Sequence, residues 1–241
     1  ADEINILDNV LVYNGWMGIY LYDSNNNTIS GNDASHNENS GISSEFSSRN
    51  TILENKITNS KYGIYMRSSE NNRITHCTIA DNEYGIYFES SDTNLVNNNN
   101  IENGGTGIAL SGINNFVQSN VLTNGLSGVI ISGSNCDVLN NTITTFGSEG
   151  YGVSMSGSNC DVLNNTITTY GYWGCYGVSM SGSNCDVLNN TITNYGYWDC
   201  CGLSIGGDNS TIVGNRVEGR GKGYGVCDVS VGGSNNIISK N

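Results

Sequence analysis

The chain has 241 residues, only 13% of them charged, and acidic residues outnumber basic ones 22 to 9. The formal net charge of −13 excludes a protein that binds nucleic acid by neutralising phosphates, and it disfavours a polybasic contact with a membrane. Proline is absent, glycine occurs 32 times, and the apolar runs are too short for a membrane span. We expect one domain over residues 1–241.

The first residues show no secretory leader, since the chain begins at Ala1 without a charged and then apolar segment. A leader already removed would leave this start. Eight cysteines in an acidic, polar chain favour an oxidising environment, so we expect an extracellular protein at a cell surface or in a sheath.

An asparagine then recurs along the whole chain, at intervals of 21 to 26 residues, with one double interval in which Cys77 takes its place. These asparagines are Asn9, Asn32, Asn55, Asn99, Asn120, Asn141, Asn165, Asn190, Asn215 and Asn241. Aliphatic residues flank each one, three residues before and two after, and two further aliphatic columns follow a glycine in most repeats. Cys77 is therefore expected to be a buried, unreactive thiol.

This alternation predicts short strands with a period of two and no helix. Such strands cannot bury a face alone, but coiling the chain stacks equivalent residues about 4.8 Å apart and forms a continuous core. The asparagine amides can pair with backbone groups at the turns and with the amide of the next coil. We predict an all-β fold: a right-handed, single-stranded parallel β-helix of about ten to eleven coils without a capping helix.

The segments Asn-Asn-Thr-Ile-Ser-Gly-Asn at Asn26–Asn32 and Gly-Ile-Tyr-Leu at Gly18–Leu21 carry a family resemblance. They resemble the right-handed parallel β-helix repeat proteins, including the NosD-like group. The resemblance covers essentially the whole chain and implies the fold. It does not imply one function, because this solenoid is used by lyases, epimerases, tailspikes and structural polymers alike.

Three signatures of catalytic β-helix proteins are missing. His36 lies in Ser-His-Asn and His76 in Thr-His-Cys, so the Gly-His-Gly of polygalacturonase-like hydrolases is absent. Without proline there is neither the Arg-x-Pro-x-x-Arg segment of pectate-lyase-like enzymes nor the Asp-Pro-His-Asp motif of mannuronan epimerases. No lysine or arginine lies between Arg73 and Arg216, although a polyuronate substrate needs cations. We therefore expect no enzyme, no metal and no cofactor.

A duplicated segment follows, in which Tyr151–Thr168 recurs unchanged as Tyr176–Thr193 and its core already occurs at Ser132–Thr144. Identical side chains should stack, aspartates included. A calcium ion would relieve the repulsion among Asp137, Asp161 and Asp186, but screened charges at an exposed turn explain them without one. Seven cysteines are cross-link candidates: Cys136, Cys160, Cys175, Cys185, Cys200, Cys201 and Cys227.

Equivalent Cα atoms of adjacent coils fall within the distance that a disulfide requires. Cys175 with Cys200 is the preferred pair, followed by Cys201 with Cys227. Of the three stacked thiols at Cys136, Cys160 and Cys185, at least one must bond another chain or stay free. Alternatively, all three are small residues that fill outward turn positions.

Two longer turns in the same region gather aromatic residues, namely Tyr170, Tyr172, Trp173, Tyr195, Tyr197 and Trp198. They are candidates for stacking on sugar rings or for a lateral contact with a neighbouring subunit.

The two ends carry opposite charge, with Asp2, Glu3 and Asp8 near one and Arg216, Arg220, Lys222 and Lys240 near the other. Because strands begin almost at once and the last residue is a ladder position, we expect uncapped ends that stack head to tail into a homopolymer.

We therefore predict a structural subunit of an extracellular sheath or cell-surface layer, reinforced by disulfides. In composition and repeats it resembles the sheath and surface proteins of filamentous methanogenic archaea. Its expected partner is a copy of itself, with cell-surface polysaccharide as a further one. The alternative is a secreted polysaccharide-binding or polysaccharide-degrading β-helix protein.

Overall fold

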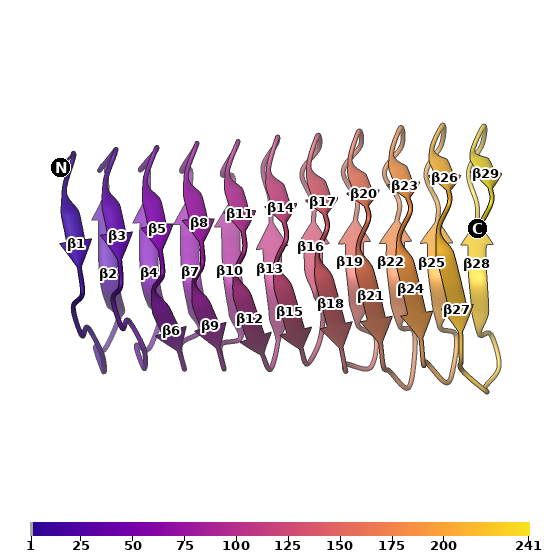
Figure 1. Ribbon diagram of the computed structural model, residues 1–241, viewed down its shortest axis with the longest axis horizontal. Helices are drawn as coiled ribbons and strands as arrows, with labels where there is room; N and C mark the ends of the chain where they lie inside the picture. The colour runs from indigo at the N-terminus through magenta and orange to yellow at the C-terminus, as the bar shows by residue number, and fades with distance from the viewer. Residues whose placement is uncertain (1) are drawn as a thin grey trace.

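The computed structural model describes residues 2–241, and all regular structure in this range is β-strand (Figure 1). The strands form three parallel sheets of 11, 8 and 10 members, which we call sheets A, B and C in the order in which a complete coil passes through them. Figure 1 shows them as a rod in which each coil lies beside the next. The predicted all-β, parallel β-helix is confirmed.

Sheet A contains β1 (Asn5–Leu7), β3 (Thr28–Ser30), β5 (Thr51–Leu53), β8 (Arg73–Thr75), β11 (Leu95–Asn97), β14 (Phe116–Gln118), β17 (Asp137–Leu139), β20 (Asp161–Leu163), β23 (Asp186–Leu188), β26 (Thr211–Val213) and β29 (Ile237–Ser239). Sheet B contains β6 (Lys56–Thr58), β9 (Thr78–Ala80), β12 (Asn100–Asn103), β15 (Val121–Asn124), β18 (Thr142–Thr145), β21 (Thr166–Thr169), β24 (Thr191–Asn194) and β27 (Arg216–Gly219). Sheet C contains β2 (Met17–Tyr22), β4 (Ser40–Glu45), β7 (Tyr62–Arg67), β10 (Tyr84–Glu89), β13 (Thr106–Leu110), β16 (Val129–Ile131), β19 (Tyr151–Met155), β22 (Tyr176–Met180), β25 (Cys201–Ile205) and β28 (Cys227–Val231).

The core consists of aliphatic columns that run along the rod. Ile64 pairs in register with Ile86, and Ile86 with Ile108, and all three side chains are fully buried. Residues of equal size thus stack directly on one another, which fills the interior without a helix or a second layer.

The predicted asparagine column lies inside the coils at the turn between sheets A and B. The Asn120 amide nitrogen donates to Val96 O and to Asn141 Oδ1, both at 3.0 Å. The backbone N–H of Asn120 donates to the same Asn141 oxygen at 2.8 Å. Repeated from coil to coil, this pattern satisfies backbone groups that the turn would otherwise leave unpaired in the core.

Two further polar columns were not predicted. One lies just before sheet A and runs through Asn27, Asn50, Asn72, Asn94 and Asn115. The side-chain oxygen of each accepts a hydrogen bond from a backbone N–H of the preceding coil. The other precedes sheet C and includes Asn37, Ser60, Asn82 and Asn103. In these coils each corner is therefore closed by hydrogen-bonded side chains, whereas the side chains of Asn124 and Thr169, which continue the second column, have no partner within residues 2–241.

Candidate functional site

The outer face of sheet C carries tyrosines in the coils that contain β7 and β10. In β7, Ile64 and Met66 point into the core, so Tyr65 between them points outward, and β10 places Tyr87 in the same way. Tyr62 and Tyr84 begin the same two strands. The four rings form one cluster with centroid separations of 5.2–5.9 Å.

A column of charges ends the same strands. Glu45 pairs in register with Arg67, and Arg67 with Glu89, so the two carboxylates lie two coils apart with the guanidinium between them. Arg67 Nη2 donates to Glu45 Oε2 at 2.5 Å, and the Tyr65 hydroxyl donates to Glu89 Oε2 at 2.5 Å. Glu45 retains only 13% of its side-chain exposure, whereas Glu89 is exposed.

Two hollows lie along this face. The larger, about 300 Å³, is lined by Trp16, Met17, Asn39, Glu45, Lys61, Tyr62, Tyr65, Tyr87 and Glu89. The other, about 230 Å³, is lined by Tyr84, Tyr87, Phe88, Ala109, Leu110, Ser111, Ile130 and Ser132. Both are lined by Tyr87, so they adjoin along the rod, and we call the two together the tyrosine groove.

The groove shifts the titration of its own side chains. Burial, and then the hydrogen bond to Glu89, raises the pKa of Tyr65 well above its usual value. Burial also raises the pKa of Tyr87. The hydrogen bond to Glu45 raises the pKa of Arg67, whose Nε is buried and finds no hydrogen-bond partner within residues 2–241. At neutral pH both tyrosines are neutral donors, and Arg67 keeps one donor unused.

The six aromatic residues singled out in the C-terminal turns lie elsewhere, beyond sheet B in later coils. The structure brings them together as stacks: Tyr170 on Tyr195 at 4.7 Å, Tyr172 on Tyr197 at 5.5 Å and Trp173 on Trp198 at 5.4 Å between centroids. Trp198 in turn stacks on Tyr224. Within each stack the rings cover one another's facing sides, and five of the six side chains remain exposed, from 38% for Tyr195 to 54% for Tyr172.

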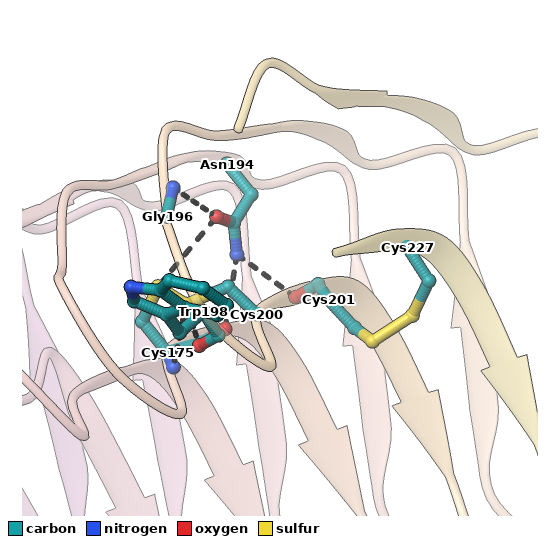
Figure 2. Close-up of a disulfide and its surroundings, with 7 residues drawn as sticks. All are labelled: Cys175, Asn194, Gly196, Trp198, Cys200, Cys201 and Cys227. Carbon is teal, nitrogen blue, oxygen red and sulfur yellow. Dashed lines mark hydrogen bonds between the residues drawn. A yellow bond between two sulfur atoms is a disulfide. The ribbon is translucent and has the colours of Figure 1, made fainter. Parts of the chain in front are cut away.

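The same region contains two disulfides, Cys175–Cys200 and Cys201–Cys227, which are the two pairs preferred from the sequence (Figure 2). Adjacent residues thus tie one coil to both of its neighbours. The Asn194 amide donates to the carbonyl oxygens of Cys175 and Cys201, and Gly196 lies so close that an added Cβ would overlap the first bridge.

The other three cross-link candidates occupy a different place from the outward turn considered for them. Cys136, Cys160 and Cys185 are fully buried, and none forms a disulfide within residues 2–241. They continue the unpredicted column that Asn115 leads, because the Asn115 N–H reaches Cys136 Sγ at 3.4 Å and the Cys136 N–H reaches Cys160 Sγ at 3.3 Å. Their thiols replace asparagine amides as interior acceptors. Cys77 is buried in the predicted ladder, as expected; its thiol donates to Thr75 O at 3.5 Å, and burial raises its pKa to about 11.

The stacked aspartates lie on sheet A, with Asp137 opposite Asp161 and Asp161 opposite Asp186. Burial and the neighbouring carboxylate raise the pKa of Asp137 and of Asp161. Within residues 2–241 there is no cluster of three or more His, Cys, Asp or Glu side chains arranged to hold a metal ion.

The sequence analysis missed the tyrosine groove. Its signal was present in the Gly-Ile-Tyr motifs, where Tyr65 and Tyr87 lie between two inward columns and must therefore face outward. The importance of Glu45 and Glu89 depends on register, because 44 residues of sequence separate them and only the coiling brings them near each other.

Residues 1–143, more than half of the chain, match the family described as "Right handed beta helix region". The chain belongs to this family. No curated protein matches the sequence.

Among solved structures, the chain is similar to the family 28 exopolygalacturonase of Yersinia enterocolitica (12% identity, TM-score 0.62, covering 89% of this chain and 47% of that one). It is also similar to the tailspike protein of E. coli bacteriophage HK620 in complex with a pentasaccharide (10%, TM-score 0.57, 88% and 48%). A third is the A-module of the mannuronan C-5 epimerase AlgE6 of Azotobacter vinelandii (15%, TM-score 0.52, 98% and 80%). At these identities the likeness is one of fold, and the chain spans about half the length of the first two.

The prediction that the protein is not an enzyme is wrong in its reasoning from missing motifs. The solved structures that share its fold are mostly glycoside hydrolases and epimerases, at identities of 12–15%. One fold serves many chemistries, so the absence of Gly-His-Gly or of proline-containing signatures does not argue against an activity of another kind.

Two observations bear on where the protein works. The two disulfides indicate an oxidising environment outside the cytosol. No helix within residues 2–241 has the length and apolarity needed to cross a membrane.

Proposed function

We propose that this protein is a secreted polysaccharide-binding or polysaccharide-degrading β-helix protein whose ligand lies along the tyrosine groove. The observation that carries the proposal is the meeting of four tyrosine rings with Glu45, Arg67 and Glu89 on one furrowed face. Glycan-acting proteins of this fold, such as the exopolygalacturonase, support it by likeness.

The groove suits a sugar chain for physical reasons. Aromatic rings offer apolar surface to the C–H faces of a pyranose, while their hydroxyl groups offer hydrogen bonds. The partly exposed guanidinium of Arg67 and the carboxylate oxygens of Glu45 and Glu89 supply further donors and acceptors beside the rings. The groove runs along the rod, so an extended polymer can contact several coils at once.

The charge of the groove selects among polysaccharides. Glu45 pairs with Arg67, and Lys61 matches the charge of Glu89, so the groove carries no net positive charge that would attract a polyuronate. The chain as a whole carries a formal charge of −13. We therefore expect a neutral or amino-sugar polymer to bind better than a polyuronate.

A degrading activity would use the two carboxylates. Two rungs of a parallel sheet place the Cα atoms of Glu45 and Glu89 roughly 9.5 Å apart. The carboxyl groups of inverting glycosidases lie about 6.5–9.5 Å apart, a separation that two long side chains on Cα atoms at this distance can reach. In such a reaction Glu45 would activate a water and the exposed Glu89 would protonate the leaving oxygen.

Binding tests the proposal with a matched pair of variants. Tyr62 pairs with Tyr84 in the groove, and Tyr151 pairs with Tyr176 at the equivalent position of two later coils. In calorimetric titrations with soluble neutral, amino-sugar and uronic-acid polymers, we expect Tyr62→Ala to weaken binding at least tenfold and Tyr151→Ala to leave it unchanged. Equal loss in both variants, or no binding of any polymer, would contradict the proposal.

Cleavage is tested separately by the release of reducing ends from the polymers that bind. Glu89→Gln and Glu45→Gln should each abolish release while retaining most of the affinity. If the unaltered protein binds a polymer but releases no reducing ends from it, the protein is a binding protein and the catalytic roles of both carboxylates are rejected.

The second candidate is the structural subunit of a sheath or cell-surface layer, of the kind that methanogenic archaea make. The two bridges that join three successive coils favour it, because they reinforce the rod along its axis. Electron microscopy at neutral pH separates the candidates: fibres or hoops that loosen only with reductant support the polymer, and monodisperse particles reject it.

A further inference from the structure

A repeated turn asparagine stands at the corner between sheets A and B of the duplicated coils. Asn140, Asn164 and Asn189 each begin the tripeptide Asn-Asn-Thr, which fits the acceptor pattern Asn-x-Ser/Thr for N-glycosylation. All three are exposed. All three also adopt the left-handed backbone conformation, with φ of 56° to 57°, as expected at a tight turn.

The two asparagines of each tripeptide differ sharply. The second one, for example Asn165, is buried, and its amide donates to Val138 O at 2.8 Å and to Asn190 Oδ1 at 3.0 Å. The side chain of the first, Asn164, makes no hydrogen bond to any residue within 2–241. The hydroxyl-bearing Thr166 that completes the pattern is exposed as well. Each duplicated coil thus presents one free acceptor amide and keeps the other for its ladder.

We propose that this column, Asn140, Asn164 and Asn189, is a site of N-linked glycosylation. The donor is a polyprenyl-phosphate-linked oligosaccharide used by a membrane-bound transferase. The asparagine Nδ2 forms a bond to the anomeric carbon, the bond from that carbon to the lipid phosphate oxygen breaks, and the phosphate leaves with the electron pair. The amide loses one proton to a base of the transferase.

The register of the coils limits how many sites are filled. Leu139, Leu163 and Leu188 pair in register directly before the three asparagines, so neighbouring acceptors are about 4.8 Å apart. A branched oligosaccharide is wider than this rung. Asn140 and Asn189, two rungs apart, can be occupied together, whereas a glycan on Asn164 excludes both neighbours.

The corner between sheets A and B lies opposite sheet C in each three-sided coil, so glycans there leave the tyrosine groove open. The site does not depend on the proposed function of that groove.

The chain supplies its own negative control. Asn98 occupies the same column in an earlier coil, is exposed and has φ of 56°, but the tripeptide Asn98-Asn99-Asn100 is no acceptor pattern. The experiment is secretion of the full chain from a eukaryotic host, followed by peptide mass spectrometry. Samples are compared with and without amidase release of N-glycans in water enriched in oxygen-18, which labels each formerly glycosylated asparagine as it becomes aspartate. Because no lysine or arginine lies between Arg73 and Arg216, the peptides are made with chymotrypsin.

We expect glycan on the column and none on Asn98, with at most two of the three sites occupied in one molecule. Asn140→Gln together with Asn189→Gln should raise the occupancy of Asn164 severalfold, because its excluding neighbours are gone. A column without glycan in a properly folded secreted chain overturns the proposal. Occupancy of all three sites in one molecule overturns the exclusion between rungs.

Discussion

The early coils, which contain β2 to β13, and the late coils, which contain β19 to β28, share one interior and differ in what they present outside. Inward, both use aliphatic columns and polar ladders in continuous register. Outward, sheet C of the early coils changes from coil to coil and gathers tyrosines and charges, whereas the late coils repeat Tyr151 as Tyr176 and Ser154 as Ser179. In-register stacking limits which residues can occupy the inward positions. Varied chemistry, and with it a binding site, therefore arises where the outward residues differ from coil to coil.

The late coils should depend on their disulfides and the early coils should not. The bridges close segments of 25 and 26 residues, and each should contribute about 3 kcal/mol to stability. In the double variant Cys200→Ser/Cys201→Ser, we expect hydrogen exchange to accelerate strongly in β22, β25 and β28 while β7 and β10 stay protected. The single variant Cys160→Ser, which removes a buried thiol without a bridge, is the control. Uniform acceleration along the rod would show that the coils unfold as one unit.

The ladder, in contrast, runs through both regions and should contribute to stability wherever it is broken. Asn120→Ala leaves the Asn99 N–H and the Val96 carbonyl without their partner and should cost about 3 kcal/mol. Asn98→Gly removes an exposed asparagine at a left-handed turn that glycine tolerates, and it should change stability little. Urea denaturation followed by circular dichroism compares the two variants. Equal stability would mean that water replaces the ladder.

These differences explain which features the sequence could predict. The inward columns and the Asn99–Asn120 ladder recur at every coil, and a repeated constraint is visible as a period. Cys136 was harder to place, because its column is asparagine from Asn27 to Asn115 and then changes residue type. The groove was missed since Glu45 and Glu89 come from separate repeats, and no period marks a pair of residues that occurs once.

The aromatic stacks of the late coils offer a further contrast with the groove. Trp198 stacks on both Trp173 and Tyr224, so Trp198→Ala should cost about 1–2 kcal/mol of stability. It should leave the affinity for polysaccharide unchanged, because neighbouring rings cover both faces of Trp198. Thermal unfolding and the titrations with soluble polymers measure the two effects. A loss of affinity as large as that of Tyr62→Ala would move the binding site to the late coils.

The smallest expected change in stability concerns the stacked aspartates of β17, β20 and β23, which have no counterpart in the early coils. Burial and the charge of Asp186 raise the pKa of Asp161, so the folded state binds its proton more tightly than the unfolded state does. The ionised carboxylate therefore costs stability, and this cost grows as the pH rises from the unfolded pKa through the raised folded pKa. Asp161→Asn should stabilise the protein by about 0.2–1 kcal/mol at pH 7, and the gain should vanish below about pH 4. Because salt near 1 M screens charges beyond about 3 Å, it should shrink the difference between variant and unaltered protein at pH 7. A gain that instead increases toward low pH would mean that the carboxylate stabilises the stack through its hydrogen bond to the Asp186 N–H.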